Sequence, residues 1–478
     1  MYEPVIGMEV HVQLLTASKL FCGCRADYVS AAPNAFTCPV CLGLPGALPV
    51  LNRKAVELSV MMGLALNCEV PPLTKWDRKN YSYPDLAKGY QISQYDLPVT
   101  RDGWLTVRVD EEERRIGIRR AHLEEDTGKL IHMGGRSYID FNRSGMPLLE
   151  IVSEPDIHSP EEARLYLVKL RSILRYLGVS TGNMEEGAMR CEANISLRPV
   201  GSTELPPTHV EVKNLNSFRA VKAAVEYEIR RQSAILDQGG QVEQVTMGWD
   251  DARSETVVQR TKEEAHDYRY FPEPDLTALR ITAEQVAEWR RQLPELPEAR
   301  VARLCRDCGL PAADAELLAE DRALADYYEK AVAAGGEALA KDLANWITGP
   351  LFRLMNQEGT ALEDLRVAPE QLAALSQSVA SGAINVTTGR QVLEEMFAGG
   401  KDPATIIRER DLVQVSDEGA LLEWVRAAVA GNPQAVQDYR SGKAQAVKFL
   451  VGQVMRASRG QANAASVEQL LKRELDSA

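Results

Sequence analysis

The sequence lacks the features of a membrane or exported protein. No stretch approaches the roughly 18 consecutive apolar residues that a membrane-spanning helix requires. The N-terminal stretch carries Glu3 and Glu9 and has no basic segment followed by an apolar one, which a signal peptide would have. We therefore expect a cytoplasmic protein that has no contact with a membrane.

Two common phosphate-binding loops are also missing. The sequence contains neither a glycine-rich loop ending in Gly-Lys-Ser/Thr nor a Gly-x-Gly-x-x-Gly run, so any nucleotide site would be non-standard. A surplus of basic residues is absent too, because the formal net charge is −13. This charge argues against a protein that coats nucleic acid, since neutralising phosphates needs surplus Lys and Arg. Local basic patches are compatible with it.

The chain is long enough for several cores, with 478 residues of which 45% are hydrophobic, and its length suggests about two to four domains. Residues 105–140 alternate in the manner of antiparallel strands. At residues 293–297, Leu-Pro-Glu-Leu-Pro, such patterns stop, and helical periodicity follows. Gly399, Gly400 and Asp402-Pro403 mark a second break. We expect an α+β fold in which strands precede helices.

Four of the eight cysteines lie close together, and in a reducing compartment cysteines favour metal binding or buried thiols over disulfides. The pairs are Cys22 with Cys24 and Cys38 with Cys41. Two such pairs joined by a short loop can converge on a tetrahedral zinc site of four thiolates. Free thiols are the alternative. Because no histidine or carboxylate supplies an open position in this segment, we expect a closed, structural zinc site.

The strand expected at residues 6–14 has one polar face. Alternation puts Glu9 and His11 on one side and the apolar residues on the other. The polar face either meets water or forms a pair of cation ligands. The acids Glu124, Glu125 and Asp126 allow the same two interpretations, a solvated turn or, if the sheet brings them beside Glu9 and His11, a cage for Mg²⁺.

Three further segments carry candidate binding residues. The loop at 73–99 interleaves basic and aromatic residues such as Lys79 and Tyr81, which suits phosphates and stacked bases but also a solvated connection. In a strand near residue 190, Arg190, Glu192 and Asn194 share one face. The tail has a local basic excess that could follow an RNA backbone or form a solvated helix face. Its residues are Arg440, Lys443, Lys448, Arg456 and Arg459.

Together these segments resemble the B-subunit family of the bacterial aspartyl/glutamyl-tRNA amidotransferases. The resemblance covers nearly the whole chain and keeps the family's order. Its segments are residues 6–12, 77–85, 90–96, 123–129, 148–157, 184–197, 213–218, 267–275 and 442–463. The resemblance implies a cradle domain built on antiparallel sheet with a kinase and transamidase site (1–292), a helical domain (293–400) and a helical tail domain that contacts tRNA (401–478).

The resemblance also implies the reaction and the partners. The family's B subunits phosphorylate the side-chain carboxylate of Glu-tRNA(Gln) or Asp-tRNA(Asn) with ATP. Ammonia from a glutaminase partner, the A subunit, then gives the amide, and a small C subunit completes a heterotrimer. The absence of a Ser-Ser-Lys amidase run fits ammonia that arrives from a partner.

The site residues expected for this chemistry follow from the needs of phosphoryl transfer, which are metal, cationic neutralisation and positioning. Glu9, His11 and one or both of Glu124 and Glu125 would hold Mg²⁺, with Glu192 as a further ligand. Mn²⁺ or a water-bridged role for His11 stays open, because Mg²⁺ prefers oxygen. Lys79 and Arg190 would neutralise phosphate. The expected nucleotide or substrate contacts are Tyr81, Asn194 and Lys213.

Two other functions are weighed against this one. The chain could be a non-catalytic, tRNA-binding structural subunit whose acidic run is only a solvated turn. A free-standing zinc hydrolase fits poorly, because a zinc ion held by four thiolates has no open position for water.

Overall fold

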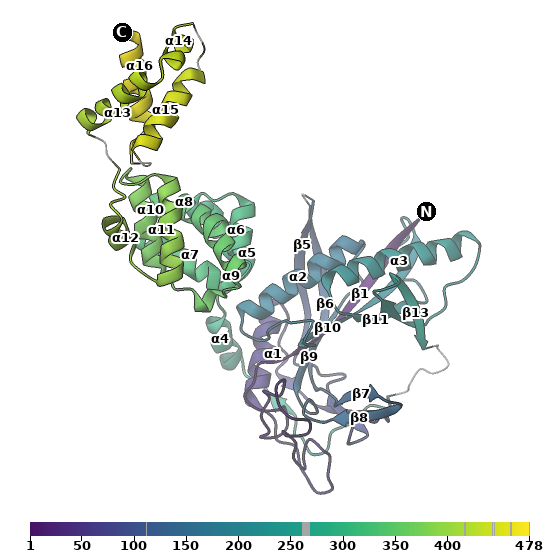
Figure 1. Ribbon diagram of the computed structural model, residues 1–478. Coiled ribbons are helices and arrows are strands. Elements are labelled where there is room, and N and C mark those ends of the chain that lie inside the picture. The colour runs from purple at the N-terminus through teal and green to yellow at the C-terminus, as the bar shows by residue number, and fades with distance from the viewer. Residues whose placement is uncertain are drawn as a thin grey trace. The chain divides into compact units, whose positions relative to one another are not determined.

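The computed structural model describes residues 1–110, 112–260, 268–414, 417–441, 443, 445–458 and 461–477. The chain divides into two compact units, Met1–Leu296 and Pro297–Ala478. All strands among the described residues belong to the first unit, and the second is helical (Figure 1). The predicted α+β class is confirmed. Within the described residues, no helix has both the length and the apolar character that crossing a membrane demands.

The largest sheet of the first unit has eight strands in the order β13-β12-β11-β10-β1-β9-β6-β5. Their bounds are β1 Tyr2–Gln13, β5 Thr100–Val109, β6 Glu112–Glu125, β9 Pro147–Ser153, β10 Met189–Pro199, β11 Val210–Leu215, β12 Thr246–Asp250 and β13 Glu255–Arg260. Neighbouring strands are antiparallel except β11 and β12, which are parallel. Between these two the chain passes through helix α3 (Phe218–Asp237), and a parallel pair needs such a crossover.

Strand β1 has two chemically different faces, as predicted. Met8, Val10 and Val12 are at most 1% exposed, whereas the intervening Glu9 and His11 lie on the opposite face. From residue 189 to 195, β10 repeats the pattern, with its apolar residues buried and its polar residues half-buried. The sheet therefore presents one face to a core and the other to a polar space.

Helices α1 (Arg53–Ala65), α2 (Pro160–Tyr176) and α3 bury the apolar face in one hydrophobic core, and Figure 1 shows α2 and α3 lying across the sheet. The start of α2 is capped, because the Ser159 side chain accepts a hydrogen bond from the backbone N–H of Glu162 at 3.1 Å and Pro160 occupies the first turn. Gly178, with φ +62°, follows the helix end. Helix α4 (Ala283–Gln292) adds Trp289 to the same core.

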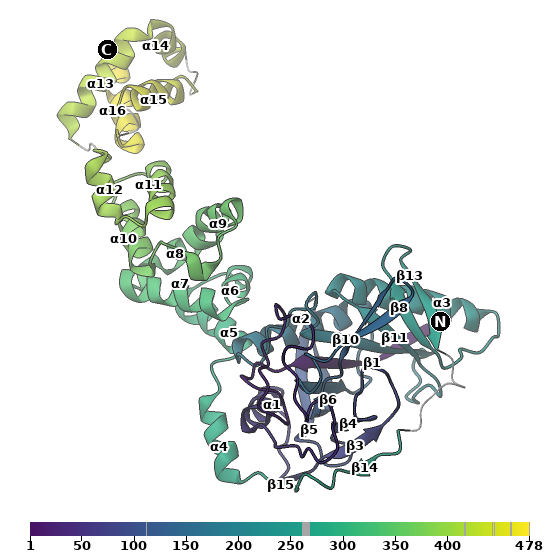
Figure 2. The same cartoon turned by 60° about the horizontal axis from the view of Figure 1, so that its bottom comes forward.

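Smaller sheets complete the first unit. Strands β14 (Phe271–Pro272), β3 (Asp77–Asn80) and β4 (Tyr90–Ser93) form one of them, and Figure 2 shows them together. The backbone N–H of Ile92 in β4 donates to Glu125 Oε1 at 2.9 Å, which ties this sheet to the end of β6. Strands β2 (Leu73–Thr74) and β15 (Leu279–Arg280) pair, and β7 (Lys129–Met133) and β8 (Arg136–Asp140) form a hairpin.

The second unit contains two separate hydrophobic cores. The first includes Leu304 through Ile407 and is built by α5 to α12, and the second includes Leu421 through Leu475 and is built by α13 to α16. The helices are α5 Pro297–Cys308, α6 Ala312–Leu318, α7 Arg322–Gly335, α8 Ala340–Trp346, α9 Phe352–Glu358, α10 Pro369–Ala380, α11 Val386–Gly399, α12 Pro403–Glu409, α13 Glu418–Gly431, α14 Pro433–Arg440, α15 Gln445–Ala457 and α16 Ala464–Ser477. A π-helical turn, Ile347–Leu351, joins α8 to α9.

Candidate active site

Four neighbouring strands place polar side chains in one row across the sheet. His11 of β1 lies opposite Arg190 of β10 on one side and Glu150 of β9 on the other. Glu150 in turn lies opposite His122 of β6. Because paired residues of adjacent strands share a face, the row brings together side chains that lie far apart in the sequence.

The row and its neighbours form a compact group of carboxylates and imidazoles, which we call the acid–histidine cluster (Glu9, His11, His122, Glu124 and Glu150). Glu150 Oε2 lies 3.3 Å from Nε2 of both His11 and His122. Glu124 reaches the same two nitrogens at 3.8 Å, and Glu9 Oε1 lies 3.8 Å from His11 Nε2. Two trios have ligand atoms within 4.8 Å of one another, Glu9/His11/Glu150 and His122/Glu124/Glu150.

Burial and charge shift the ionisation of the cluster. Burial alone lowers the pKa of His11, but the hydrogen bond and charge of Glu150, with help from Glu124 and Glu9, raise that pKa to about 9. The same balance raises the pKa of His122 to about 9. The pKa of Glu150 stays well below its ordinary value despite burial, because both imidazoles face it, while burial and the Glu150 charge raise the pKa of Glu9 to about 7. Protonated imidazoles therefore balance the carboxylates when no cation does.

The cluster lines a cavity of about 430 Å³ whose other walls carry four basic residues and three further carboxylates, those of Asp126, Glu192 and Glu211. The basic lining residues are Lys79, Arg120, Arg190 and Lys213. Arg190 Nη2 lies 2.8 Å from Asp126 Oδ2. The Lys79 ammonium lies 4.9 Å from the centre of the Tyr268 ring. The cavity thus places a group that can hold a cation beside groups that can hold anions.

Most of the residues expected from the sequence line this cavity. They are Glu9, His11, Lys79, Tyr81, Glu124, Arg190, Glu192 and Lys213. Glu192 Oε2 lies 2.5 Å from Lys213 Nζ. Asn194 lies further along β10 on the same face as Arg190 and is not among the lining residues.

Glu125 is the expected ligand that the structure does not bring to the cluster. It follows Glu124 in a strand, so its side chain points to the opposite face. There its carboxylate pairs with Lys88 and accepts the backbone N–H of Ile92. The described geometry gives Glu125 a structural partner instead of a place beside His11.

Sequence reasoning missed Glu150 and His122, which complete the cluster. A lone carboxylate inside the buried apolar stretch of β9 is the signal that could have found Glu150, since such a charge needs a partner. His122 lies two residues before Glu124, at the strand period that puts both on one face. The lining Tyr268 and Tyr270 come from the segment 267–275, of which the described residues begin at 268.

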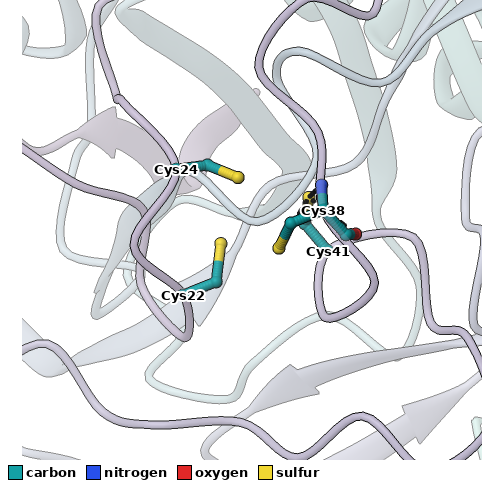
Figure 3. Close-up of side chains that lie close together, drawn as sticks. All are labelled: Cys22, Cys24, Cys38 and Cys41. Carbon is teal, nitrogen blue, oxygen red and sulfur yellow. Dashed lines mark hydrogen bonds between the residues drawn. The ribbon is translucent and has the colours of Figure 1, made fainter.

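The four cysteines of the zinc prediction lie together in the structure (Figure 3). Their sulfur atoms are all within 4.8 Å of one another, and those of Cys38 and Cys41 are 3.9 Å apart. Zn–S bonds of about 2.3 Å in a tetrahedron put sulfurs about 3.8 Å apart, so the group has the dimensions of a four-thiolate metal site. The hydrogen bond from the Cys22 thiol, with help from the Cys38 amide and the Lys19 charge, lowers the pKa of Cys41 to about 5 despite burial.

The basic residues of the tail are at the surface. Arg440 ends α14, Lys443 follows it, and Lys448 and Arg456 lie two turns apart on α15, all of them exposed. Lys443 Nζ lies 2.9 Å from Asp438 Oδ1. Arg459 lies outside the described residues.

Comparison with known proteins identifies the family. Residues 4–287 match the family model of the GatB/GatE catalytic domain, which is more than half of the chain. The chain belongs to the GatB/GatE family. Residues 326–475 match the GatB domain. The family predicted from the sequence is confirmed, and the whole acid–histidine cluster lies within the GatB/GatE catalytic domain.

Relatives in the GatB/GatE family are similar over their full length. The B subunit of the aspartyl/glutamyl-tRNA(Asn/Gln) amidotransferase of Moorella thermoacetica is 55% identical over 478 residues, which cover 99% of this chain and 100% of the relative. Proteins of the same name from Thermomicrobium roseum and Herpetosiphon aurantiacus are 54% and 53% identical, each over 99% of both chains.

Proposed function

We propose that this chain is the B subunit of a glutamine-dependent ligase that forms a carbon–nitrogen bond on misacylated tRNA. It would bind Glu-tRNA(Gln) or Asp-tRNA(Asn), phosphorylate the side-chain carboxylate with ATP, and let ammonia replace the phosphate to give Gln-tRNA(Gln) or Asn-tRNA(Asn). The observation that carries the proposal is the acid–histidine cluster in a cavity that four basic side chains also line. The names of the relatives support the tRNA substrate and the amidotransferase reaction.

The cluster fits a divalent cation. Glu9, Glu124 and Glu150 offer the hard carboxylate oxygens that Mg²⁺ prefers, while the imidazoles of His11 and His122 favour Mn²⁺ or contact through water. We propose Glu9, His11, Glu124 and Glu150 as the residues that would hold the ion. When bound, the cation would neutralise the γ-phosphate and the carboxylate that approaches it.

The chemistry explains why such a site needs ATP. A carboxylate repels a nucleophile and its oxygen is a poor leaving group. An oxygen of the substrate carboxylate attacks the γ-phosphorus, the bond from that phosphorus to the β,γ-bridging oxygen breaks, and ADP leaves. Ammonia then attacks the acyl carbon, phosphate leaves with the former carboxylate oxygen, and the nitrogen loses one proton. Positioning and charge neutralisation supply most of the catalysis.

The basic residues of the cavity would hold the anions of this reaction. Burial lowers the pKa of Lys79, but the charges of Glu124 and Glu150 raise it above its ordinary value, so the ammonium stays charged near neutral pH. Lys79 and Arg190 are proposed to neutralise the phosphates. Tyr81 and Lys213 in the cavity wall, and Asn194 beside it, are proposed as nucleotide or substrate contacts.

The proposed partners and domain roles follow the family. Ammonia would come from a glutaminase partner, the A subunit, and a small C subunit would join that partner to this chain, which agrees with the word "subunit" in the relatives' names. Residues 1–292 would be catalytic, 293–400 would form a helical domain, and 401–478 would contact tRNA. The four cysteines would hold a structural zinc ion.

A reconstituted enzyme tests the proposal. The chain, assembled with its partner subunits, receives ATP, Mg²⁺, glutamine and each misacylated tRNA in turn, and the amide is measured after deacylation. His11→Ala should lower turnover on the order of 100-fold and leave tRNA affinity unchanged. His132→Ala is the matched control, because His132 is exposed in the β7–β8 hairpin. Full turnover of His11→Ala would favour a non-catalytic, tRNA-binding protein instead.

A further inference from the structure

The helical unit contains a pocket that the proposed function does not use. It has a volume of about 250 Å³. Trp346 of α8, Pro350 of the π-helical turn and Val379 of α10 provide apolar walls. The walls thus come from three elements of one hydrophobic core.

Local backbone features shape this pocket. The π-helical turn Ile347–Leu351 contains Pro350, which has no N–H for the helical ladder, and such wide turns are frequent at functional sites. Gly389 of α11 packs closely against the Trp346 indole. A Cβ added at this glycine would lie only 3.0 Å from Trp346 Cη2. The aromatic wall is therefore held in place before any ligand arrives.

A buried hydroxyl in the pocket lacks a partner. Ser376 of α10 lines the pocket and is 1% exposed. Among the described residues its Oγ has no hydrogen-bond partner. A buried hydroxyl left unpaired is unfavourable, so this group is suited to a ligand that brings a hydrogen-bonding atom.

The rim of the pocket adds one acid, one amide and one cation. Asp342, Asn345 and Arg390 line the pocket and are exposed. Within the part of the chain that the structure describes, none of these side chains has a hydrogen-bond or ion-pair partner. These three side chains can therefore contact a ligand that has hydrogen-bond donors and acceptors and an adjoining negative charge.

We propose that this pocket binds one unstacked base of the tRNA, an inference that rests on the proposed function and adds a contact to the same substrate. Pockets for drug-sized ligands measure about 300–1,000 Å³, so 250 Å³ suits one heterocyclic ring system better than a whole nucleotide. The flat faces of a base stack on aromatic side chains, and its edge has donors and acceptors. Asn345, Asp342 and Ser376 match such an edge, and Arg390 matches the adjoining phosphate.

The apolar side chain of a partner protein is a poorer occupant. It would fill the walls formed by Trp346 and Val379 but would leave the Ser376 hydroxyl buried without a partner. It would also make no use of the charge on Arg390. The polar groups of the pocket therefore favour the base.

The test fills the pocket and measures tRNA binding. Ala380, the last residue of α10, lines the pocket and is exposed, so Ala380→Phe places a ring at its opening. Ala374→Phe is the matched control, an exposed alanine on the same helix that is not among the lining residues. Asn345→Ala removes a contact without filling the pocket. The assembled enzyme carrying each variant is titrated with unacylated tRNA at several salt concentrations.

Ala380→Phe and Asn345→Ala should each weaken tRNA affinity about tenfold, and Ala374→Phe should not change it. Arg390→Gln should reduce the slope of log Kd against log salt by about one. Reagents that modify the pairing edges of bases should find one base protected by the unaltered enzyme and reactive with Ala380→Phe.

If Ala380→Phe and Asn345→Ala bound tRNA as tightly as the unaltered enzyme, the base-binding role of the pocket would be overturned and the proposed function would stand. Loss of a partner protein from Ala380→Phe without loss of tRNA affinity would assign the pocket to that protein and overturn it as well. If the unaltered enzyme binds no tRNA, the proposed function fails together with the pocket.

Discussion

Glu124 and Glu125 are adjacent in β6 and point to opposite faces, so replacing each by Gln distinguishes a carboxylate that would hold a cation from one that would not. Glu124 lies 3.8 Å from the Nε2 atoms of both His11 and His122. Glu125 instead pairs with Lys88. Glu124→Gln therefore removes charge from the acid–histidine cluster, whereas Glu125→Gln removes one partner of a buried ion pair.

The two variants should differ in their effect on cation binding. Glu125 is 3% exposed and the Lys88 side chain 12%, and removing one partner of a buried pair costs about 3–5 kcal/mol. Because Gln keeps an acceptor for the backbone N–H of Ile92, we expect about 3 kcal/mol for Glu125→Gln, at the lower end of that range. Glu124→Gln should weaken cation binding on the order of 100-fold, about 2.7 kcal/mol.

Mn²⁺ titration followed by electron paramagnetic resonance measures cation affinity, and urea unfolding measures stability. Glu124→Gln should lose Mn²⁺ affinity, whereas Glu125→Gln should keep Mn²⁺ affinity and lower the unfolding midpoint. If Glu125→Gln lost Mn²⁺ affinity as strongly as Glu124→Gln, the assignment of the two carboxylates to opposite faces would be wrong.

Three further predictions concern other parts of the chain. Glu161 bridges α2 and α3 through Arg164 and Lys222, and the hydrogen bond from Arg164, then that from Lys222, lower its pKa from 4.5 to about 2. The resulting stabilisation is present above pH 4.5 and lost as pH falls toward 2. Since the side chain is 35% exposed, solvent screening limits it to about 1 kcal/mol, and urea unfolding of Glu161→Gln should show that deficit at pH 7 and a smaller one at pH 3. Zinc analysis should find one ion per chain, and Cys24→Ser should lose it; full zinc retention by Cys24→Ser would contradict the site. Lys19→Met removes the buried ammonium 3.7 Å from Cys41 Sγ. This variant should weaken zinc binding about tenfold in chelator competition. Residues 417–478 hold the core of α13 to α16. Their removal should weaken tRNA binding most at low salt and leave the thermal unfolding of the first unit unchanged. A lower unfolding temperature of the first unit would show that the tail stabilises it.

The local features of the fold could be predicted from sequence because short-range physics determines them. The alternation in β1 and β10 showed which face each polar side chain would take. A serine followed by a proline, as at Ser159 and Pro160, favours a helix start, and a glycine such as Gly178 favours a helix end. The spacing of the four cysteines predicted a group that the structure brings together.

The order of the strands could not be predicted in this way, and it decides which side chains meet. Glu150 lies between Leu149 and Ile151, so its stretch reads as a buried strand, and only the pairing of β9 with β1 and β6 gives it two imidazole neighbours. The run Glu124-Glu125-Asp126 does not reveal which of its side chains face the cavity either. Whether the first or the second acid faces the cavity depends on the register of β6, which the pairing with β9 sets.

Turnover of Glu150→Gln in the reconstituted enzyme tests the central claim most directly, since Glu150 belongs to both trios of candidate cation ligands. Glu154→Gln is the control, because Glu154 follows β9 and pairs with the exposed Arg119 at 2.7 Å. The account predicts that Glu150→Gln loses ATP cleavage dependent on misacylated tRNA and loses amide formation, while tRNA affinity and Glu154→Gln turnover stay normal. Normal turnover of Glu150→Gln would contradict the account.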